Sequence, residues 1–301
     1  MHFRGVVALL IVTMVWGTTF PAMKVLTPYF PAVWITVLRF VLASLVLLPF
    51  LLRAKAPEWK AGVLLGVFLF ANFMLQVEGL ALISSNRNAF ITGLNVLIVP
   101  LLGVLLGKLP ERRIVLAVLL ALGGLVALCW ESGTWGRGET LTLLGALCFG
   151  VYVKVMERST RQVTQLICLT ATQIVTVTVA ATLWLLLVGV PDMASHYPMG
   201  GQDQLSYIWQ GIRLHGWNLA YLGVIATAAI IALQTWGQGH TSANEAAIIY
   251  SFEPGCAAIA GYFWVGETMT PLALLGALLL IIGMIVSQWQ ASSVPTAPLP
   301  Q

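Results

Sequence analysis

The chain is a succession of long apolar runs separated by short polar or charged breaks. Each run is about 20 residues long, which is the length of helix needed to cross the hydrocarbon core of a bilayer. Clusters of Pro, Gly and charged residues separate the runs. This pattern predicts ten membrane-spanning helices, approximately at residues 5–26, 32–52, 61–82, 88–107, 113–130, 140–157, 164–190, 217–238, 244–266 and 271–289. We therefore expect an all-α integral membrane protein.

The first run, residues 5–23 after Arg4, has the charge pattern of a signal peptide. The apolar core of a signal peptide is about 7–15 residues long and ends at a small-x-small site. This run is longer and contains the bulky Trp16 and Phe20, so we expect it to remain as the first membrane helix. Residues 290–301 are uncharged and rich in Pro, and we expect them to be disordered.

Composition agrees with the membrane prediction and narrows the choice of partners. Of the 301 residues 59% are hydrophobic and only 9% are charged, whereas a soluble domain carries about 25% charged residues. The net charge of +4 does not indicate nucleic-acid binding, because the basic residues sit singly at the ends of apolar runs. The expected partners are the lipid bilayer and a small molecule.

The Lys and Arg residues give an expected orientation, because they are enriched in cytoplasmic loops. With the N-terminus in the cytoplasm, the ten spans place ten of the fifteen on the cytoplasmic side and four outside, with Arg39 inside a span. The cytoplasmic ten are Arg4, Arg53, Lys55, Lys60, Lys108, Arg112, Arg113, Lys154, Arg158 and Arg161. We expect a multi-pass protein of the plasma membrane, namely of a bacterial inner membrane, with both termini cytoplasmic.

The chain contains an internal repeat. A shift of 159 residues lays Gly107 on Gly266, Gly124 on Gly283 and Trp130 on Trp289, and brings the ISSNRNA stretch near Ser84 onto TSANEA near Ser242. A shift of 133 residues lays Gly5 on Gly138, Trp16-Gly17 on Phe149-Gly150, and Lys24 on Glu157. Each half holds five spans, an odd number, so the second half enters the membrane upside down. Two inverted five-helix repeats place a substrate site near the midplane of the membrane.

These residues resemble a known family. The stretches WGTTFP, RFVLA around Arg39, GLALISSNRNAFITGLNVLIVPLLGVLLGK, and EP with VGE and LLGALLLIIGM in the last two spans are similar to the EamA repeats of the drug/metabolite transporter superfamily. The resemblance covers residues 5–130 and 138–289 as two repeats. It implies a central cavity lined mainly by the first, third, fourth, sixth, eighth and ninth spans, and export or exchange of small metabolites, among them amino acids and related compounds. Lys108 departs from the family's usual Gly-Glu, which is present at Gly266-Glu267, and the loop 191–216 is longer than usual.

Polar side chains in the spans form stripes, because helical neighbours at i+3 or i+4 share a face. Each such residue either lines a cavity or bonds one helix to another, and Trp16 and Tyr152 either line the cavity or pack. The predicted substrate-binding residues are Trp16, Thr19, Asn72, Gln76, Asn88, Thr92, Asn95, Tyr152, Gln234, Gln238, Tyr250 and Glu253.

Charges within the spans are the sharper signal, because a charge at mid-bilayer costs about 2.5–3.5 kcal/mol on insertion scales. Glu253 precedes Pro254, which leaves a backbone carbonyl free to meet a ligand or water. Glu253 is therefore a candidate for proton coupling or substrate binding. A structural partnership with Arg39 or a backbone group, and an end-cap role, are the alternatives. Glu78 is the second coupling candidate, and Arg39 is expected to be structural.

The sequence contains no motif that is typical of an enzyme or of a metal site. The sequence has no HExxH, no GxSxG and no Walker A loop, and its four His and four Cys residues are scattered. We expect no enzymatic activity, no cofactor and no metal. GxxxG occurs at Gly62–Gly66 and Gly103–Gly107, which favours close helix packing and is compatible with a homodimer.

The leading interpretation is a secondary transporter that works by alternating access. The alternative is a membrane assembly or signalling subunit with a vestigial cavity. In the loop 191–216, Leu205, Ile208, Trp209 and Ile212 recur at helical spacing and predict a short amphipathic helix. That helix is expected to lie on the outer headgroup layer, with a lid over the cavity and disorder as the alternatives.

Overall fold

A computed structural model of the chain describes residues 2–98, 101, 112–130, 135–190, 197, 199–200 and 203–288. Within these ranges the side chains of residues 2, 113–114, 128–130, 244 and 287–288 are left out. Lys108, the Gly103–Gly107 motif and the tail 290–301 therefore lie outside the described residues.

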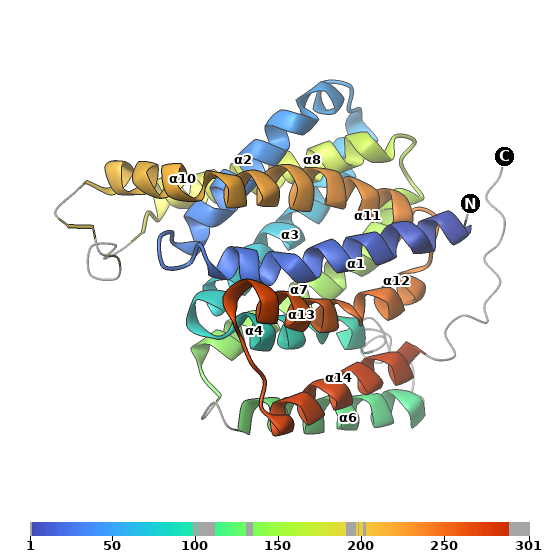
Figure 1. Cartoon of the computed structure of the whole chain (residues 1–301). Coiled ribbons are helices and arrows are strands. Elements are labelled where there is room, and N and C mark those ends of the chain that lie inside the picture. The colour runs from blue at the N-terminus through green and yellow to red at the C-terminus, as the bar shows by residue number, and fades with distance from the viewer. Residues whose placement is uncertain are drawn as a thin grey trace.

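The described residues form helices joined by short connections, which confirms the all-α fold (Figure 1). The helices are α1 (His2–Lys24), α2 (Ala32–Leu51), α3 (Ala56–Leu82), α4 (Ser85–Gly93), α6 (Arg112–Trp130), α7 (Arg137–Thr160), α8 (Leu166–Leu187), α10 (Gln204–Ala220), η1 (Tyr221–Ala229), α11 (Ile230–Gln238), α12 (Ala243–Tyr250), α13 (Glu253–Val265) and α14 (Pro271–Gln288). In the described part of the chain, six helical stretches are long and apolar enough to cross a membrane, and shorter apolar helices lie in α6 and α14.

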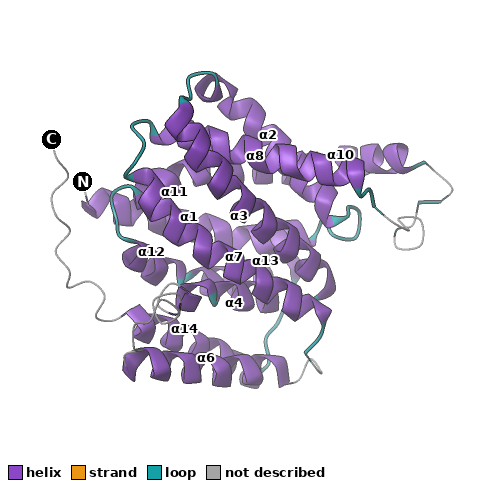
Figure 2. Cartoon of the chain, turned by 180° about the vertical axis from the view of Figure 1, so that it is seen from behind, coloured by secondary structure: helices purple, strands orange, loops and turns teal. Residues whose placement is uncertain are grey.

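The helices run alternately between two ends of the molecule. At one end, which we call the Lys24 end, α1 and α3 finish and α4 and α7 begin; at the other, the Thr160 end, α7 finishes and α12 begins. Helices α6 and α14 lie side by side along one edge of the molecule in both views (Figures 1 and 2).

Close helix crossings at glycines show that the two halves are related by a pseudo-twofold axis. A Cβ at Gly124 of α6 would lie 2.6 Å from the carbonyl oxygen of Gly276 in α14, and a Cβ at Gly283 of α14 would lie 2.8 Å from that of Ala117 in α6. Residues 117 and 124 correspond to 276 and 283 under the shift of 159. The contact is therefore reciprocal, as a twofold relation requires.

The shift of 133 is reproduced in the same way. A Cβ at Gly79 of α3 would meet the carbonyl oxygen of Gly138 at 2.8 Å, and a Cβ at Gly237 of α11 would meet that of Gly5 at 3.3 Å. The third and eighth spans are thus related by an offset of 158, one residue less than the shift of 159 predicts there. The N-caps Ser84 and Ser242 of the fourth and ninth spans share this offset.

The fourth and ninth spans are not the continuous helices that the hydrophobic pattern predicts. Helix α4 ends at Gly93, followed by a turn at Leu94 and a short helical stretch at residues 95–98. Helices α12 and α13 are separated by a turn at Ser251 and Phe252. Broken helices at corresponding positions of two inverted repeats expose backbone groups near the membrane midplane, where transporters place their substrate sites.

The amphipathic helix predicted within the loop 191–216 is present, but it does not lie separately on the surface. Helix α10 begins at Gln204 with Asp203 as its N-cap and continues through η1 into α11, bending only at His215. Its Tyr207 and Ile208 pack in a cluster with Phe30 from the α1–α2 connection. The eighth span therefore starts 13 residues earlier than predicted, and the predicted surface helix is its extension.

The Gly62–Gly66 motif of α3 serves packing within the chain. A Cβ at Gly66 would lie 2.5 Å from the Cβ of Thr176 in α8, and a Cβ at Gly62 would collide with Thr172 of the same helix. The face of α3 that carries this motif is therefore occupied by α8.

Candidate functional site

Two aromatic residues meet where the repeats join. The rings of Trp16 in α1 and Phe149 in α7 are 5.6 Å apart between centroids, with an angle of 71° between their planes. Residue 149 is the equivalent of residue 16 under the shift of 133, so this contact marks the pseudo-twofold axis. Tyr250 of α12 packs on Trp16 at 5.6 Å, and Tyr152 stacks on Phe149 at 5.4 Å.

A small cavity adjoins this aromatic pair. Its volume of about 30 Å³ has room for about two water molecules, at about 10–15 Å³ each. Ligand pockets measure about 300–1,000 Å³, so the cavity must widen before it accepts a metabolite. Its wall consists of Trp16, Thr19, Phe20, Arg39, Leu69, Asn72, Phe73, Gln76, Thr92, Phe149 and Glu253.

Six of the predicted site residues share this cavity, namely Trp16, Thr19, Asn72, Gln76, Thr92 and Glu253. Gln76 donates from Nε2 to Thr92 Oγ1 at 3.2 Å. The indole N–H of Trp16 and Oδ1 of Asn72 are buried and have no hydrogen-bond partner within the described structure. A buried polar atom without a partner costs about 1–3 kcal/mol, so these two groups mark places where water or a ligand would bind.

Arg39 belongs to the cavity wall, although the second span was not expected to line it. Its Nε donates to Thr227 Oγ1 and its second terminal nitrogen donates to the carbonyl of Ala226 at 3.2 Å. The guanidinium lies over the ring of Phe73, 4.6 Å from the centroid. Both acceptors lie in η1, a π-helix, which is a rare element that occurs frequently at functional sites.

Glu253 is the first residue of α13, at the break between α12 and α13. A carboxylate at a helix N-terminus is stabilised by the helix dipole. Its carboxyl group reaches the cavity and forms no ion pair with Arg39 or any other residue that the structure describes. The structure thus shows no Arg39–Glu253 ion pair, while the position of Glu253 at the start of α13 fits the alternative of an end-cap role.

Three other predicted residues form a separate cluster on the Thr160 side of the aromatic pair. Tyr152 donates its hydroxyl to Oε1 of Gln234 at 3.2 Å, and Gln234 donates from Nε2 to Oε1 of Gln238 at 3.2 Å. Gln173 of α8 joins this cluster, because its Oε1 also accepts from Tyr152 at 3.0 Å. We call Tyr152, Gln173, Gln234, Thr235 and Gln238 the inner polar cluster.

The remaining predicted residues are used for packing or ring contacts. Asn88 donates to the carbonyl of Gln76 at 3.1 Å and to Thr142 Oγ1 at 2.8 Å, tying α4 to α3 and α7. Asn95 donates to the carbonyl of Thr92 at 2.8 Å, just after the break in its helix. Tyr250 contributes its ring next to Trp16.

The Lys24 end is closed by polar ties between the repeats. Glu267, beyond the end of α13, accepts hydrogen bonds from the backbone N–H groups of Ser85 and Asn86 at 2.8 and 2.9 Å. Arg87 in α4 pairs with Glu139 in α7 at 2.8 Å, with both side chains buried. Glu78, the second coupling candidate, lies near this end of α3 and does not line the cavity.

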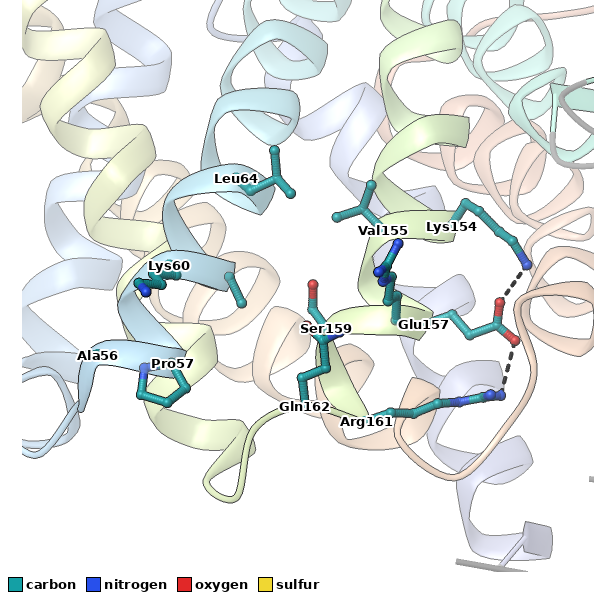
Figure 3. Close-up of a pocket in the computed structure, with 12 residues that line it drawn as sticks. Ala56, Pro57, Lys60, Leu64, Lys154, Val155, Glu157, Ser159, Arg161 and Gln162 are labelled. Carbon is teal, nitrogen blue, oxygen red and sulfur yellow. Dashed lines mark hydrogen bonds and ion pairs between the residues drawn. The ribbon is translucent and has the colours of Figure 1, made fainter. Parts of the chain in front are cut away.

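The Thr160 end opens into a wide vestibule of about 1020 Å³ between α3 and α7 (Figure 3). Lys60, Lys154, Arg158 and Arg161 line it, and Glu157 is the acid among them. Glu157 bridges Lys154 at 2.6 Å and Arg161 at 3.3 Å. The vestibule is therefore a positively charged pocket that is open to solvent.

Comparisons with known proteins agree with this architecture. The model of the EamA-like transporter family matches residues 3–130 and 136–288. A protein of Archaeoglobus fulgidus described as an uncharacterized transporter is 26% identical over 299 residues, covering 92% of this chain and 83% of the relative. A second one from the same organism is 27% identical over 260 residues, covering 84% and 85%.

A solved structure titled only "Crystal structure of protein" has the same fold. It superposes with a TM-score of 0.63 at 17% sequence identity and covers 94% of this chain and 96% of its own. The family match spans both halves, and the relatives cover most of the chain. The resemblance read from the sequence is thereby confirmed: the chain is a multi-pass membrane transporter and belongs to the EamA-like transporter family of the drug/metabolite transporter superfamily.

Proposed function

We propose that this transporter moves a small polar metabolite, of the size and chemistry of an amino acid, by alternating access around the cavity at Trp16 and Phe149. The observation that carries the proposal is a cavity at the junction of the repeats whose wall includes two buried, unpartnered polar atoms, on Trp16 and Asn72. Such groups stay buried at a cost of about 1–3 kcal/mol each. A substrate that bonds to them recovers this cost.

The proposed substrate site comprises the nine predicted residues that line the cavity or belong to the inner polar cluster, with Gln173, Arg39 and Phe149 added. The other three predicted residues, Asn88, Asn95 and Tyr250, are proposed to support this site by packing. The two repeats, residues 5–130 and 138–289, are the proposed moving units, and both termini are proposed to be cytoplasmic. The basic vestibule then faces the cytoplasm, which agrees with the enrichment of Lys and Arg in cytoplasmic loops. Export or exchange is the proposed direction.

Glu253 is the proposed coupling group. It is a carboxyl group on the cavity wall without a protein cation as partner in the described structure. Proton coupling requires a group that changes charge during the cycle. One charge moved through 100 mV is worth about 2.3 kcal/mol, which is enough to drive accumulation.

The test is solute counterflow in proteoliposomes, with L-threonine, L-phenylalanine, uracil, succinate and putrescine as labelled probes. We expect exchange of at least one polar probe. We expect Glu253→Gln to lose accumulation driven by a proton gradient while it retains exchange. Glu58→Gln is the matched control, because Glu58 is equally buried but caps the start of α3 away from the cavity.

Two outcomes would contradict the proposal. A purified protein that exchanges no probe, and whose thermal stability no probe raises, would support the non-transporting subunit instead. A Glu253→Gln variant that still accumulates substrate against a gradient would move the coupling role elsewhere, with Glu78 as the next candidate.

A further inference from the structure

The pseudo-twofold axis pairs Gln76 with Gln234. The reciprocal contacts of Gly79 and Gly237 relate α3 to α11 by an offset of 158 residues. The same offset takes Gln76 to Gln234. Although each amide occupies the same place in its own repeat, the inversion of the repeats puts the two amides on opposite sides of the Trp16–Phe149 contact.

The two amides lie toward opposite ends of the molecule. Gln76 lines the small cavity and lies six residues before the end of α3, at the Lys24 end. Gln234 lies in the inner polar cluster, four residues before the end of α11, at the Thr160 end. At a rise of about 1.5 Å per residue, each is within about 10 Å of its own end of the helix.

Beside each amide there is also a buried polar atom without a partner in the described structure. Near Gln76 this atom is Oδ1 of Asn72, one turn earlier on α3. Near Gln234 it is Nε2 of Gln238, one turn later on α11, whose Oε1 is already bonded to Gln234. Native proteins leave few such atoms, and each calls for an explanation. A ligand that reaches either Gln76 or Gln234 would meet an amide and, beside it, an atom that is free to form a hydrogen bond.

The charges around Gln76 and around Gln234 restrict which substrate can bind at both places. The inner polar cluster contains hydroxyls and amides and no charged residue (Tyr152, Gln173, Gln234, Thr235 and Gln238). The cavity near Gln76 carries one cation, Arg39, and one acid, Glu253, and their formal charges cancel while Glu253 is ionised. A substrate with a net charge would lie uncompensated against the inner polar cluster, at a cost of several kcal/mol in hydrocarbon.

We propose that the protein binds its substrate at two half-sites in turn, one centred on Gln76 and reached from the Lys24 end, the other centred on Gln234 and Gln173 and reached from the vestibule. The substrate is a small polar molecule without net charge. Trp16 and Phe149 separate the half-sites, and their rings must move apart for the substrate to pass. This inference rests on the proposed transport function and adds to it the sidedness of binding and the charge of the substrate.

The test measures the KM for uptake on each face of the membrane. Right-side-out and inverted membrane vesicles present opposite faces to the medium, and the five labelled probes named above are added outside each kind of vesicle. We expect Gln76→Ala to raise the KM about tenfold on one face and less than twofold on the other, as the loss of about one hydrogen bond implies. Gln234→Ala and Gln173→Ala are expected to do the same on the opposite face.

Control variants separate binding from folding. Gln210→Ala removes an exposed amide from α10 outside both half-sites and is expected to leave both values of KM unchanged. Gln76→Asn and Gln234→Asn keep an amide but shorten it by one methylene group, so they carry the test if an alanine variant does not fold.

The possible results separate this inference from the function on which it rests. Equal effects of Gln76 and Gln234 substitutions on both faces would overturn the two half-sites while leaving transport intact. Uptake of succinate or putrescine in preference to L-threonine, L-phenylalanine and uracil would overturn the assignment of a neutral substrate. A wild-type protein that takes up no probe in either vesicle would contradict the proposed function itself, and the half-sites with it.

Discussion

Two adjacent glycines of α6 offer a direct test of the inverted-repeat packing. A Cβ at Gly124 would lie 2.6 Å from the carbonyl oxygen of Gly276 and 2.8 Å from the backbone nitrogen of Leu280, closer than real Cβ atoms approach. A Cβ at Gly123 would meet nothing within 4 Å. The substitutions Gly124→Ala and Gly123→Ala therefore differ chiefly in the contact with α14.

The difference between these variants isolates the steric cost. Both gain the same helix propensity, about 1 kcal/mol for Gly to Ala in water, and this contribution cancels between neighbouring positions of one helix. The remaining term is overpacking, which costs about 1–3 kcal/mol because the two helices must move apart by several tenths of an ångström. At about 2–4 °C per kcal/mol, a cost of about 2 kcal/mol lowers the Tm of Gly124→Ala by about 4–8 °C relative to Gly123→Ala.

The assay is thermal unfolding of the purified protein in detergent, followed by tryptophan fluorescence and by size-exclusion chromatography after heating. Gly283→Ala should reproduce the loss, because its Cβ would lie 2.8 Å from the carbonyl oxygen of Ala117 in the reciprocal contact. The double variant should lose less than the sum of the two, since helices already separated relieve both clashes. Equal Tm values for the Gly124 and Gly123 variants would refute the close crossing and the twofold relation inferred from it.

Three further predictions concern the Lys24 end and the topology. Arg87→Gln should lower the free energy of unfolding by about 2 kcal/mol. This is below the usual cost of breaking a buried pair, because Glu139 keeps its hydrogen bond from the N–H of Gly136. Adding Glu139→Gln should not double the loss, and additive losses would mean that the two side chains do not interact. Glu267→Ala should destabilise by about 1–2 kcal/mol and speed amide hydrogen exchange at the start of α4, where its carboxylate accepts two backbone N–H groups; unchanged exchange there would contradict the tie. A reporter fused after Gln290 and one inserted near Gly200 should report opposite sides of the membrane, and a shared compartment would refute the ten-span topology.

Polar residues in the spans were recognisable from the sequence because a polar group in hydrocarbon is costly and needs a reason to be there. Trp16, Thr19, Asn72, Gln76, Thr92 and Glu253 were selected on this ground, and they share one cavity wall. The same argument selected Asn88 and Asn95, which bond to neighbouring backbone instead. Polarity alone does not distinguish a residue that lines a cavity from one that joins two helices.

Arg39 and Gln173 are two residues whose place in the site the sequence does not reveal. Gln173 is an amide inside an apolar run, a signal of the same kind as Gln234, but its span was not expected to line the cavity. Arg39 was interpreted as structural for the same reason, and it both bonds to η1 and lines the cavity. Which face a helix turns inward depends on the helices packed around it, and neither residue carries that information locally.

The apolar runs and the glycine repeats determined the spans and their duplication, because hydrocarbon forces the backbone into helices and close crossings require glycine. The tertiary structure decided the breaks after Gly93 and Tyr250, the junction of α10 with the eighth span, and the division of the polar residues by the Trp16–Phe149 contact. These features arise where segments far apart in the chain meet. Their physical cause is the packing of inverted repeats against each other, which a single span cannot encode.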